Sequence, residues 1–367
     1  AEAAVLVVAC DTPVDDRDEA DVPFVRARLE ALRPHLRPGT VVLVTSQVPV
    51  GFTRALARDW AGLGLHVAYS PENLRLGKAI ACFNAPERIV LGTDSATART
   101  VLAELLSPFC TRLEWMSLES AEMTKHAINA FLGLSVTFAN ELARICEVVG
   151  ADAREVERGL KSEGRIGEKA YLSPGSAFAG GTLARDVRFL QAFGALHRLA
   201  TPLVDGVLAS NDLHKAWLRD KVALLTAGIA RPVVAVLGLT YKPGTDTLRR
   251  SAAVELCRWM HGQGIAVQAH DPAVQELPAD LAGVLRLHAS ATGALAAADV
   301  AVVATEWPEY RRLTASDFSV AMRHARVIDP NWFLAAGLEA APGVLYLATG
   351  RPATLPVGAR PPTVAAP

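Results

Sequence analysis

Short apolar runs alternate with helix-length amphipathic segments over residues 1–116. The runs are "AAVLVVAC", "TVVLVTSQ", "HVAYSP" and "RIVLG", and segments such as "VPFVRARLEALRPHL" and "TRALARDWAGLG" lie between them. Short, unbroken runs rich in valine are typical of parallel strands whose two faces are both buried. The pattern therefore predicts a βαβ series with helices on both faces of a parallel sheet, which is half of a doubly wound fold.

The pattern becomes helical over residues 117–215. The segment "SLESAEMTKHAINAFLGLSVTFANELARICEVVG" carries apolar side chains near helical spacing. Ser117 can cap its start, and Glu119 and Glu122 suit the positive end of a helix dipole. A helix of ~30 residues is ~45 Å long, which is unusual in a globular domain. We therefore expect a helical middle domain whose long helix is a spine and a homodimer interface.

Residues 216–350 return to an α/β pattern. "PVVAVLGLTYKPGTD" predicts a strand and a loop, "SAAVELCRWMHGQG" a helix that ends at glycine, and "IAVQAHDP" the next strand. Further strands are expected at "ADVAVVATEWPEY", "ARVIDP" and "VLYLA". Residues 351–367 are rich in proline without apolar periodicity, so we expect a disordered tail.

Composition narrows the class of protein. The 367 residues are enough for two or three domains, and a net charge of -1 gives no electrostatic footprint for nucleic acid or anionic lipid. No apolar run approaches the ~20 residues that span a bilayer. The five scattered cysteines contain no CxxC pair and are typical of a reducing cytosol. The nine histidines have no metal-binding spacing, so we expect no metal, no membrane partner and a cytoplasmic location.

Polar side chains cluster where the predicted strands end. Ligands of doubly wound folds bind at the carboxyl ends of strands, so we expect a ligand cleft between the two α/β lobes. Lys125 and Asn129 are four residues apart and share one face of the long helix, whereas His126 is expected to point away from them and to be structural or exposed. The strand-end candidates are Asp11, Thr12, Pro13, Ser46, Gln47, Pro49, Pro71, Glu72, Asn73, Lys242 and Asp246.

The stretch "SPGSAFAGGTLARD", residues 173–186, has the composition of an active-site loop. Its glycines permit a ligand to approach the backbone closely. Arg185 and Asp186 place two charges beside the glycines, and Thr182 stands where such a loop would carry a nucleophile.

These motifs, in order and with compatible spacing to about residue 350, resemble the UDP-glucose/GDP-mannose 6-dehydrogenases. The matching segments are "SQVPVGFT", "SPENLRLGKAI", "PERIVLGTD", "AEMTKHAINAFLGL", "AFAGGTLARD", "VLGLTYKPGTDTLRRS", "HDP" and "TEWPEY". The resemblance implies an NAD-binding Rossmann domain at residues 1–116, a helical dimerisation domain at 117–215 and a nucleotide-sugar-binding lobe at 216–350.

The family begins with a strand and a glycine-rich phosphate loop, but nothing in residues 1–40 matches GxGxxG, and the first residue is Ala. We therefore expect truncation, and an α/β fold with two Rossmann-like doubly wound lobes, the first incomplete, joined by the long central helix. The 367-residue chain is expected to bind NAD weakly or not at all, because glycines and a helix N-terminus supply the pyrophosphate contacts.

The family transfers two hydrides from the sugar C6 to NAD; a cysteine holds the acyl group as a thioester, and water releases the acid. By motif position, Lys125 and Asn129 would stabilise the oxyanion, Asp186 would organise the water, and Glu72 would take part in acid–base work and thioester hydrolysis. The resemblance further assigns Thr12, Ser46 and Arg249 to the cofactor and Arg75, Gly180 and Lys242 to the substrate.

Several positions depart from the family pattern. Thr182 replaces the cysteine nucleophile, Arg185 a lysine, Gln47 a threonine, Leu76 an acid and Asn331 an arginine. A threonine hydroxyl attacks well only beside a positioned base.

Three interpretations remain open. In the first, the chain is an oxidoreductase that runs only the alcohol–aldehyde step or oxidises a hydrated aldehyde without covalent capture. In the second, it is a nucleotide-sugar-binding homologue without turnover. In the third, it is a two-step enzyme in which Thr182 or another group takes the role of the cysteine. A one-step enzyme yields at most one NADH per sugar. A Thr182→Cys variant would approach two if Glu72 and Asp186 can deliver the hydrolytic water.

Overall fold

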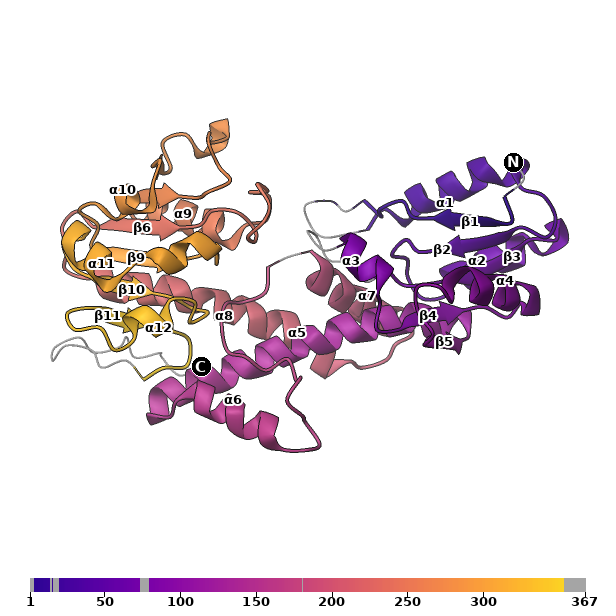
Figure 1. Ribbon diagram of the computed structural model, residues 1–367, viewed down its shortest axis with the longest axis horizontal. Coiled ribbons are helices and arrows are strands. Elements are labelled where there is room, and N and C mark those ends of the chain that lie inside the picture. Colours follow the sequence, from indigo (N-terminus) through magenta and orange to yellow (C-terminus); the bar gives the residue numbers. More distant parts are fainter. Residues whose placement is uncertain (1–2, 14, 16–19, 73–78, 180, 353–367) are drawn as a thin grey trace. The chain divides into compact units, whose positions relative to one another are not determined.

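The computed structural model describes residues 3–13, 15, 20–72, 79–179 and 181–352, and the chain divides into two compact units (Figure 1). The first unit is Ala1–Phe131 with Gly180–Val204, and the second is Leu132–Ala179 with Asp205–Pro367. The expected substrate residues Arg75 and Gly180, and the predicted tail from residue 353, lie outside the described residues. Within the described ranges, no helix combines the length and apolar character needed to cross a bilayer.

The first unit contains a five-stranded sheet with the order β1-β2-β3-β4-β5. Its strands are β1 (Val5–Val8), β2 (Val41–Val44), β3 (His66–Tyr69), β4 (Ile89–Gly92) and β5 (Leu113–Met116). β1, β2 and β3 are parallel neighbours, and β4 is parallel to β5. The expectation of a wholly parallel arrangement is wrong at "RIVLG", because β4 pairs with β3 in antiparallel orientation. An apolar run does not encode strand direction, which depends on whether the connection crosses the sheet.

Helices cover both faces of this sheet, as the alternating pattern predicts. The helices are α1 (Val22–Leu32), α2 (Phe52–Asp59), α3 (Ala79–Asn84), α4 (Ala96–Leu106), α5 (Leu118–Val149) and α7 (Thr182–Leu196). Successive strand residues point to opposite faces: Val42 and Val44 pack in one cluster with α1, α2 and the start of α5. Val41 and Leu43 pack in the other cluster with α4.

The long helix α5 has 32 residues, which confirms the helix expected there. Ser117 caps it, because its hydroxyl oxygen accepts from the Ser120 backbone N–H at 3.2 Å. Glu122 instead caps a different helix: its carboxylate accepts from the backbone N–H groups of Gly51 at 2.6 Å and Thr53 at 2.8 Å, at the start of α2. Burial raises the pKa of Glu122. The Glu122 contacts tie the β2–α2 connection, which carries Gln47, to α5.

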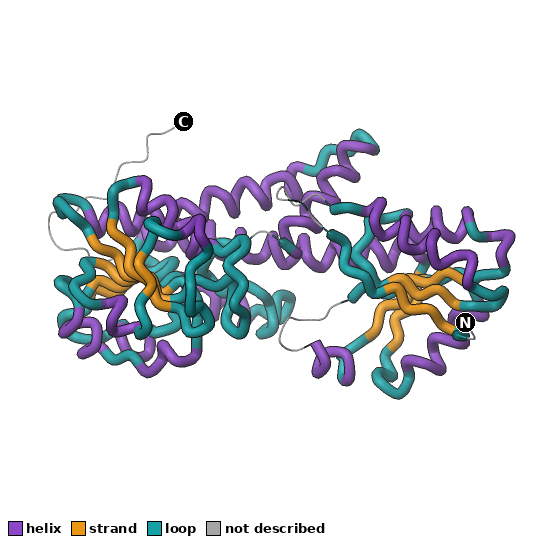
Figure 2. The backbone as a smooth tube through the Cα atoms, turned by 90° about the horizontal axis from the view of Figure 1, so that it is seen from above, coloured by secondary structure: helices purple, strands orange, loops and turns teal. Residues whose placement is uncertain are grey.

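The second unit contains a six-stranded sheet with the order β11-β10-β9-β6-β7-β8, in which all neighbours are parallel. This is the strand order of a doubly wound sheet. Starting from β6, the chain adds β7 and β8 on one side and then β9, β10 and β11 on the other, so the order of strand addition reverses between β6 and β9. Figure 2 shows one separate group of strands in each unit. The strands are β6 (Val233–Leu237), β7 (Ala266–His270), β8 (Arg286–Leu287), β9 (Val300–Val303), β10 (Arg326–Ile328) and β11 (Leu345–Leu347).

Helices also cover both faces of the second sheet. The helices on the sheet are α8 (Pro202–Thr226), α9 (Ala252–Gly262), α10 (Ala291–Leu295), α11 (Ala315–Ala321) and α12 (Ala335–Leu338), whereas α6 (Ala153–Ser162) packs against the end of α5. α8 and α9 share one apolar cluster with the sheet, and α10, α11 and α12 share the other. The predicted α/β class with two Rossmann-like lobes and a long helix is confirmed.

Candidate functional site

Helices α5 and α7 of the first unit bring four of the polar side chains together. Lys125, His126 and Asn129 lie on α5, and Asp186 lies in the second turn of α7. All four are buried, and Asp186 has no exposed surface. A carboxylate this deep in a protein requires hydrogen-bond donors, because desolvation disfavours its charged form.

Asp186 accepts hydrogen bonds from three side chains. His126 Nδ1 lies 2.6 Å from Asp186 Oδ1, and the Gln47 amide nitrogen donates to the same oxygen. The Asn129 amide nitrogen donates to Asp186 Oδ2. The aspartate is thereby the centre of a network that joins α5, α7 and the end of β2.

The expectation that His126 points away from the site is wrong. His126 is three residues before Asn129, and residues three apart are neighbours on a helix surface. Its Nε2 lies 3.0 Å from the Val48 carbonyl oxygen, and its ring meets the Phe189 ring edge-on at 4.9 Å between centroids. Nε2 faces a carbonyl oxygen and Nδ1 faces a carboxylate, and both partners are acceptors, so the two hydrogen bonds require a hydrogen on each ring nitrogen.

Gln47 joins Asp186 to the preceding arginine. Its carbonyl oxygen accepts from the Arg185 guanidinium while its nitrogen donates to Asp186. The Thr12 hydroxyl donates to the Gln47 backbone oxygen at 2.6 Å, which holds the Gln47 backbone as well. Among the described residues, Arg185 Nε is buried without a hydrogen-bond partner.

Lys125 lies beside this network and contacts the segment after β3. Its ammonium donates to the backbone oxygen of Glu72 at 2.8 Å, while the Glu72 side chain is exposed. Burial lowers the pKa of Lys125 below its usual 10.5, although the negative charges of Asp186 and Glu72 act in the opposite direction. A buried cation of this kind can stabilise an oxyanion or give up its proton.

Thr182 is the first residue of α7, is exposed, and stands four residues before Asp186. Gly181 precedes it with a φ of 101°, a backbone conformation that L side chains rarely adopt. The other half of this loop belongs to the second unit. There, side-chain oxygens of Asn140, Asn211 and Asn331 accept from the backbone N–H groups of Gly175, Phe178 and Ser176. Asn331, which replaces an arginine of the family pattern, is one of these loop anchors.

The cofactor candidates Thr12 and Ser46 lie at the carboxyl ends of β1 and β2. The Ser46 hydroxyl donates to the Cys10 backbone oxygen at 2.6 Å, as Thr12 does to Gln47. Each hydroxyl donates its single hydrogen to a backbone carbonyl oxygen, so the lone pairs of both hydroxyl oxygens remain able to accept. These lone pairs are able to accept a hydrogen bond from a donor such as a carboxamide N–H.

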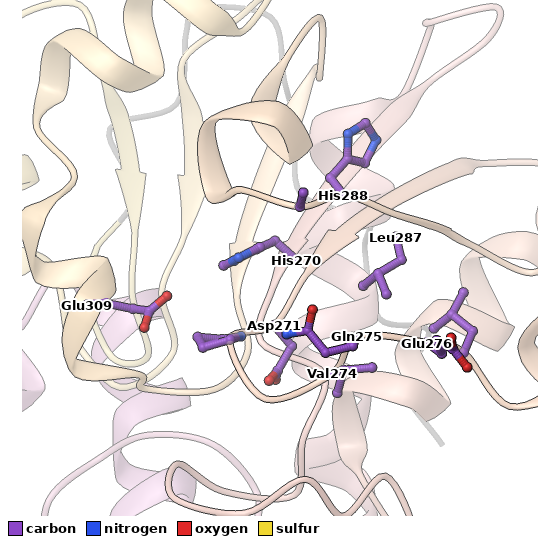
Figure 3. Close-up of a pocket in the computed structure, with 11 residues that line it drawn as sticks. His270, Asp271, Val274, Gln275, Glu276, Leu287, His288 and Glu309 are labelled. Atoms are coloured by element: carbon purple, nitrogen blue, oxygen red, sulfur yellow. The ribbon is translucent and has the colours of Figure 1, made fainter.

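The substrate candidate Lys242 and the cofactor candidate Arg249 lie in the second unit, on the loop after β6. Asp271, at the end of β7, holds the start of this loop by accepting from the backbone N–H groups of Leu239 at 2.7 Å and Thr240 at 2.9 Å. A neighbouring pocket has a volume of about 690 Å³. Its lining includes His270, Asp271, His288 and Glu309 (Figure 3). Asp271 Oδ2 accepts hydrogen bonds from the backbone of the loop after β6, so Asp271 positions this loop rather than a ligand.

The structure brings Lys125, Asn129 and Asp186 together, with the Glu72 backbone at the lysine. Lys242 and Arg249 lie in the other unit. Sequence reasoning missed the role of His126 and the direct contact between Gln47 and Asp186. The spacing of three between His126 and Asn129 was the signal that could have indicated the first.

Three domain profiles of one protein family match successive parts of this chain. Residues 1–110, 119–213 and 235–335 match the NAD-binding, central and UDP-binding domain profiles of the UDP-glucose/GDP-mannose dehydrogenase family. The UDP-glucose 6-dehydrogenase TuaD of Bacillus subtilis is 31% identical over 95% of this chain and 77% of the relative. The UDP-glucose 6-dehydrogenase of Rhizobium meliloti is 33% identical over 95% of this chain and 82% of the relative.

A solved structure has the same fold. The UDP-glucose dehydrogenase of the archaeon Pyrobaculum islandicum aligns with a TM-score of 0.80 and 28% identity, over 96% of this chain and 82% of the other.

Proposed function

Because this chain belongs to the UDP-glucose/GDP-mannose dehydrogenase family, we propose that it oxidises C6 of a UDP- or GDP-hexose with NAD and releases the aldehyde. The observation that carries the proposal is the placement of Thr182. It stands at the first turn of α7, one helical turn before Asp186, while Lys125, Asn129 and Asp186 form a buried cluster.

The chain's own residues support the alcohol–aldehyde step. As the C6 hydroxyl gives up its proton, the negative charge that develops on its oxygen would be stabilised by the Lys125 ammonium and the Asn129 amide until the hydride leaves C6. NAD accepts the hydride, which is the chemistry that this cofactor supplies. The balanced reaction is R–CH₂OH + NAD⁺ → R–CHO + NADH + H⁺. Thr12 and Ser46 would hold the nicotinamide end, and Glu72 would lie beside Lys125 for acid–base work.

The second oxidation of the family has no nucleophile here. Thr182 offers a hydroxyl where the family has a thiol, and the hydroxyl is a weak nucleophile without an adjacent base. Asp186, the nearest acid on the same helix face, is buried and bonded to three other side chains. Covalent capture of the aldehyde is therefore absent from the proposed reaction.

Single-turnover NADH measurement tests this function. The test uses a full-length form that binds NAD, since the 367-residue chain itself is expected to bind NAD weakly or not at all. With NAD in excess, UDP-glucose, UDP-N-acetylhexosamines and GDP-mannose are each offered, and an aldehyde-reactive hydroxylamine traps the product. We expect one NADH and one trapped aldehyde per sugar nucleotide. Two NADH per sugar would overturn the one-step proposal. Binding of the sugar nucleotide without any NADH would instead support a binding homologue without turnover.

The proposal divides ligand binding between the units. The first unit would hold NAD, and the second would hold the nucleotide through Lys242; the family pattern assigns Arg249 to the cofactor. Arg75 and Gly180 complete the substrate contacts in this assignment. The corresponding domains are residues 1–116, 117–215 and 216–350, followed by a tail at 351–367.

We propose in addition that the protein is a cytoplasmic homodimer built on α5. Phe138, Ile145 and Val149 are 46%, 56% and 69% exposed and recur at two-turn and one-turn intervals along this helix. A stripe of this kind suits a second copy of the same helix. All five cysteines are free thiols, which suits a reducing compartment.

A further inference from the structure

We propose that Gln47 and His126 occupy the acceptor positions of Asp186 and so prevent this carboxylate from activating a water, which makes the aldehyde the final product. The inference rests on the proposed function, because it explains why that reaction ends after one oxidation. It assigns Gln47 and His126 as positioning residues that determine the number of oxidation steps.

The hydrogen-bond donors around Asp186 use most of the lone pairs of its carboxylate. A carboxylate has about four lone-pair positions. Oδ1 accepts from His126 at 2.6 Å and from Gln47, and Oδ2 accepts from Asn129. Asp186 has no exposed surface through which solvent could reach the remaining position. A general base must reach the proton it removes directly or through one water, and this carboxylate is enclosed by protein donors.

Gln47 cannot easily turn away from the aspartate. Its side-chain oxygen is held by Arg185, and its backbone oxygen is held by Thr12 at 2.6 Å. The amide also fills volume. Replacing glutamine by threonine removes two side-chain heavy atoms, or about 30 Å³, which is the share of one water in the liquid. A shorter side chain at residue 47 would therefore leave both an acceptor on Asp186 and room for a water.

His126 offers no alternative base. Its Nε2 donates to the Val48 carbonyl oxygen at 3.0 Å, and its Nδ1 faces Asp186 at 2.6 Å. Phe189 packs edge-on against the ring and covers it. Both ring nitrogens are used within the protein, so the ring orients Asp186 and does not receive a proton from a water.

The consequence follows from the balance of the second oxidation. R–CHO + H₂O + NAD⁺ → R–COO⁻ + NADH + 2 H⁺ requires the protons of a water to be removed during attack on the carbonyl carbon or on a thioester. Without Asp186 as the acceptor, hydrolysis of the free aldehyde or of an acyl group at residue 182 would depend on the exposed Glu72 side chain and would be slow. A thiol at residue 182 would then accumulate as an acyl adduct.

A test that needs no cofactor is deacylation of a thiol placed at residue 182. The T182C variant is acetylated with phenyl thioacetate, and the tryptic peptide 170–185 is followed by mass spectrometry. This peptide contains none of the five native cysteines, so their acylation does not interfere. We expect deacylation at the rate of a free thioester in T182C and at least about tenfold faster in Q47T/T182C, the size of effect expected of general base catalysis or larger.

Two matched variants define the cause. Q47M/T182C removes the amide but keeps the volume, and it should remain at the slow rate. Q47T/D186N/T182C removes the carboxylate after water has been admitted, and it should also be slow. Equal deacylation in T182C and Q47T/T182C, or a fast rate that survives D186N, would overturn the proposal. Circular dichroism at each step confirms that the compared variants are folded.

NADH stoichiometry separates this inference from the proposed function. We expect T182C to release two NADH per active site and then stall with the acyl group attached, whereas Q47T/T182C continues to turn over to the acid. If no variant forms NADH but the deacylation pattern is as expected, the proposed function fails and the role of Gln47 stands. If wild type forms one NADH and deacylation does not respond to residue 47, only the present inference fails.

Discussion

At the scale of single residues, the buried ammonium of Lys125 gives the site a distinct pH dependence. Burial lowers its pKa below the usual 10.5, so the cation is lost at a lower pH than on an exposed lysine. Oxyanion stabilisation needs the protonated form, and kcat should therefore fall as the pH rises through this lowered pKa. In Lys125→Arg the charge persists to above pH 12, and the alkaline fall should disappear. Profiles of kcat for NADH formation from pH 7 to pH 11 measure the difference, and an unchanged alkaline limb in Lys125→Arg would assign the fall to another group.

The same scale shows where residue-by-residue reasoning from sequence succeeds and where it stops. The spacing of four between Lys125 and Asn129 correctly indicated one helix face. The contact of Gln47 with Asp186 joins residues 139 positions apart, and no local pattern encodes such a contact. His126 illustrates the same limit: it is adjacent to Lys125 but three residues from Asn129, and the second spacing brings it to Asp186.

At the scale of elements, the exposed stripe of α5 makes a direct prediction. Phe138→Asp places a charge within the stripe that includes Ile145 and Val149. Burying an unpaired charge in an apolar interface is costly, so the dimer should dissociate at micromolar concentration. Multi-angle light scattering gives the mass, and exposed Thr100→Asp on α4 is the control that should leave the mass unchanged. A wild type that is itself monomeric at this concentration would refute the interface.

The type of each element was predictable from periodicity, because a strand that is buried on both faces has a short, unbroken run of apolar residues. The four valine-rich runs became β1 to β4, and the helical pattern after residue 117 became α5. Strand direction was not predictable in the same way. β3 and β4 pair at Tyr69 and Gly92 in antiparallel orientation, and the composition of either strand is also compatible with a parallel pair.

At the scale of the whole molecule, each of the two units is built on its own sheet, and the candidate groups are divided between them. Lys125, Asn129 and Asp186 belong to the first unit, and Lys242 belongs to the second. The family profiles follow the same succession along the chain, with the NAD-binding domain first and the UDP-binding domain last. This division into two lobes could be predicted from the sequence, because each lobe has its own alternation of strand and helix patterns and the motifs follow in a fixed order.

This division predicts that two lysines affect different kinetic parameters. Lys242→Ala removes a charge-assisted contact to the nucleotide, which is worth about 1.5–3 kcal/mol, so the Kd for the sugar nucleotide should rise about 10- to 150-fold. NAD affinity should be unchanged, because Lys242 lies in the other unit from Thr12 and Ser46. Lys125→Ala should lower kcat, with a much smaller effect on either Kd, because its charge acts on the developing oxyanion. Titration calorimetry with each ligand and steady-state kinetics separate the two effects. Equal weakening of NAD and sugar nucleotide by Lys242→Ala would contradict the assignment, since it would indicate damage to both units rather than loss of one contact.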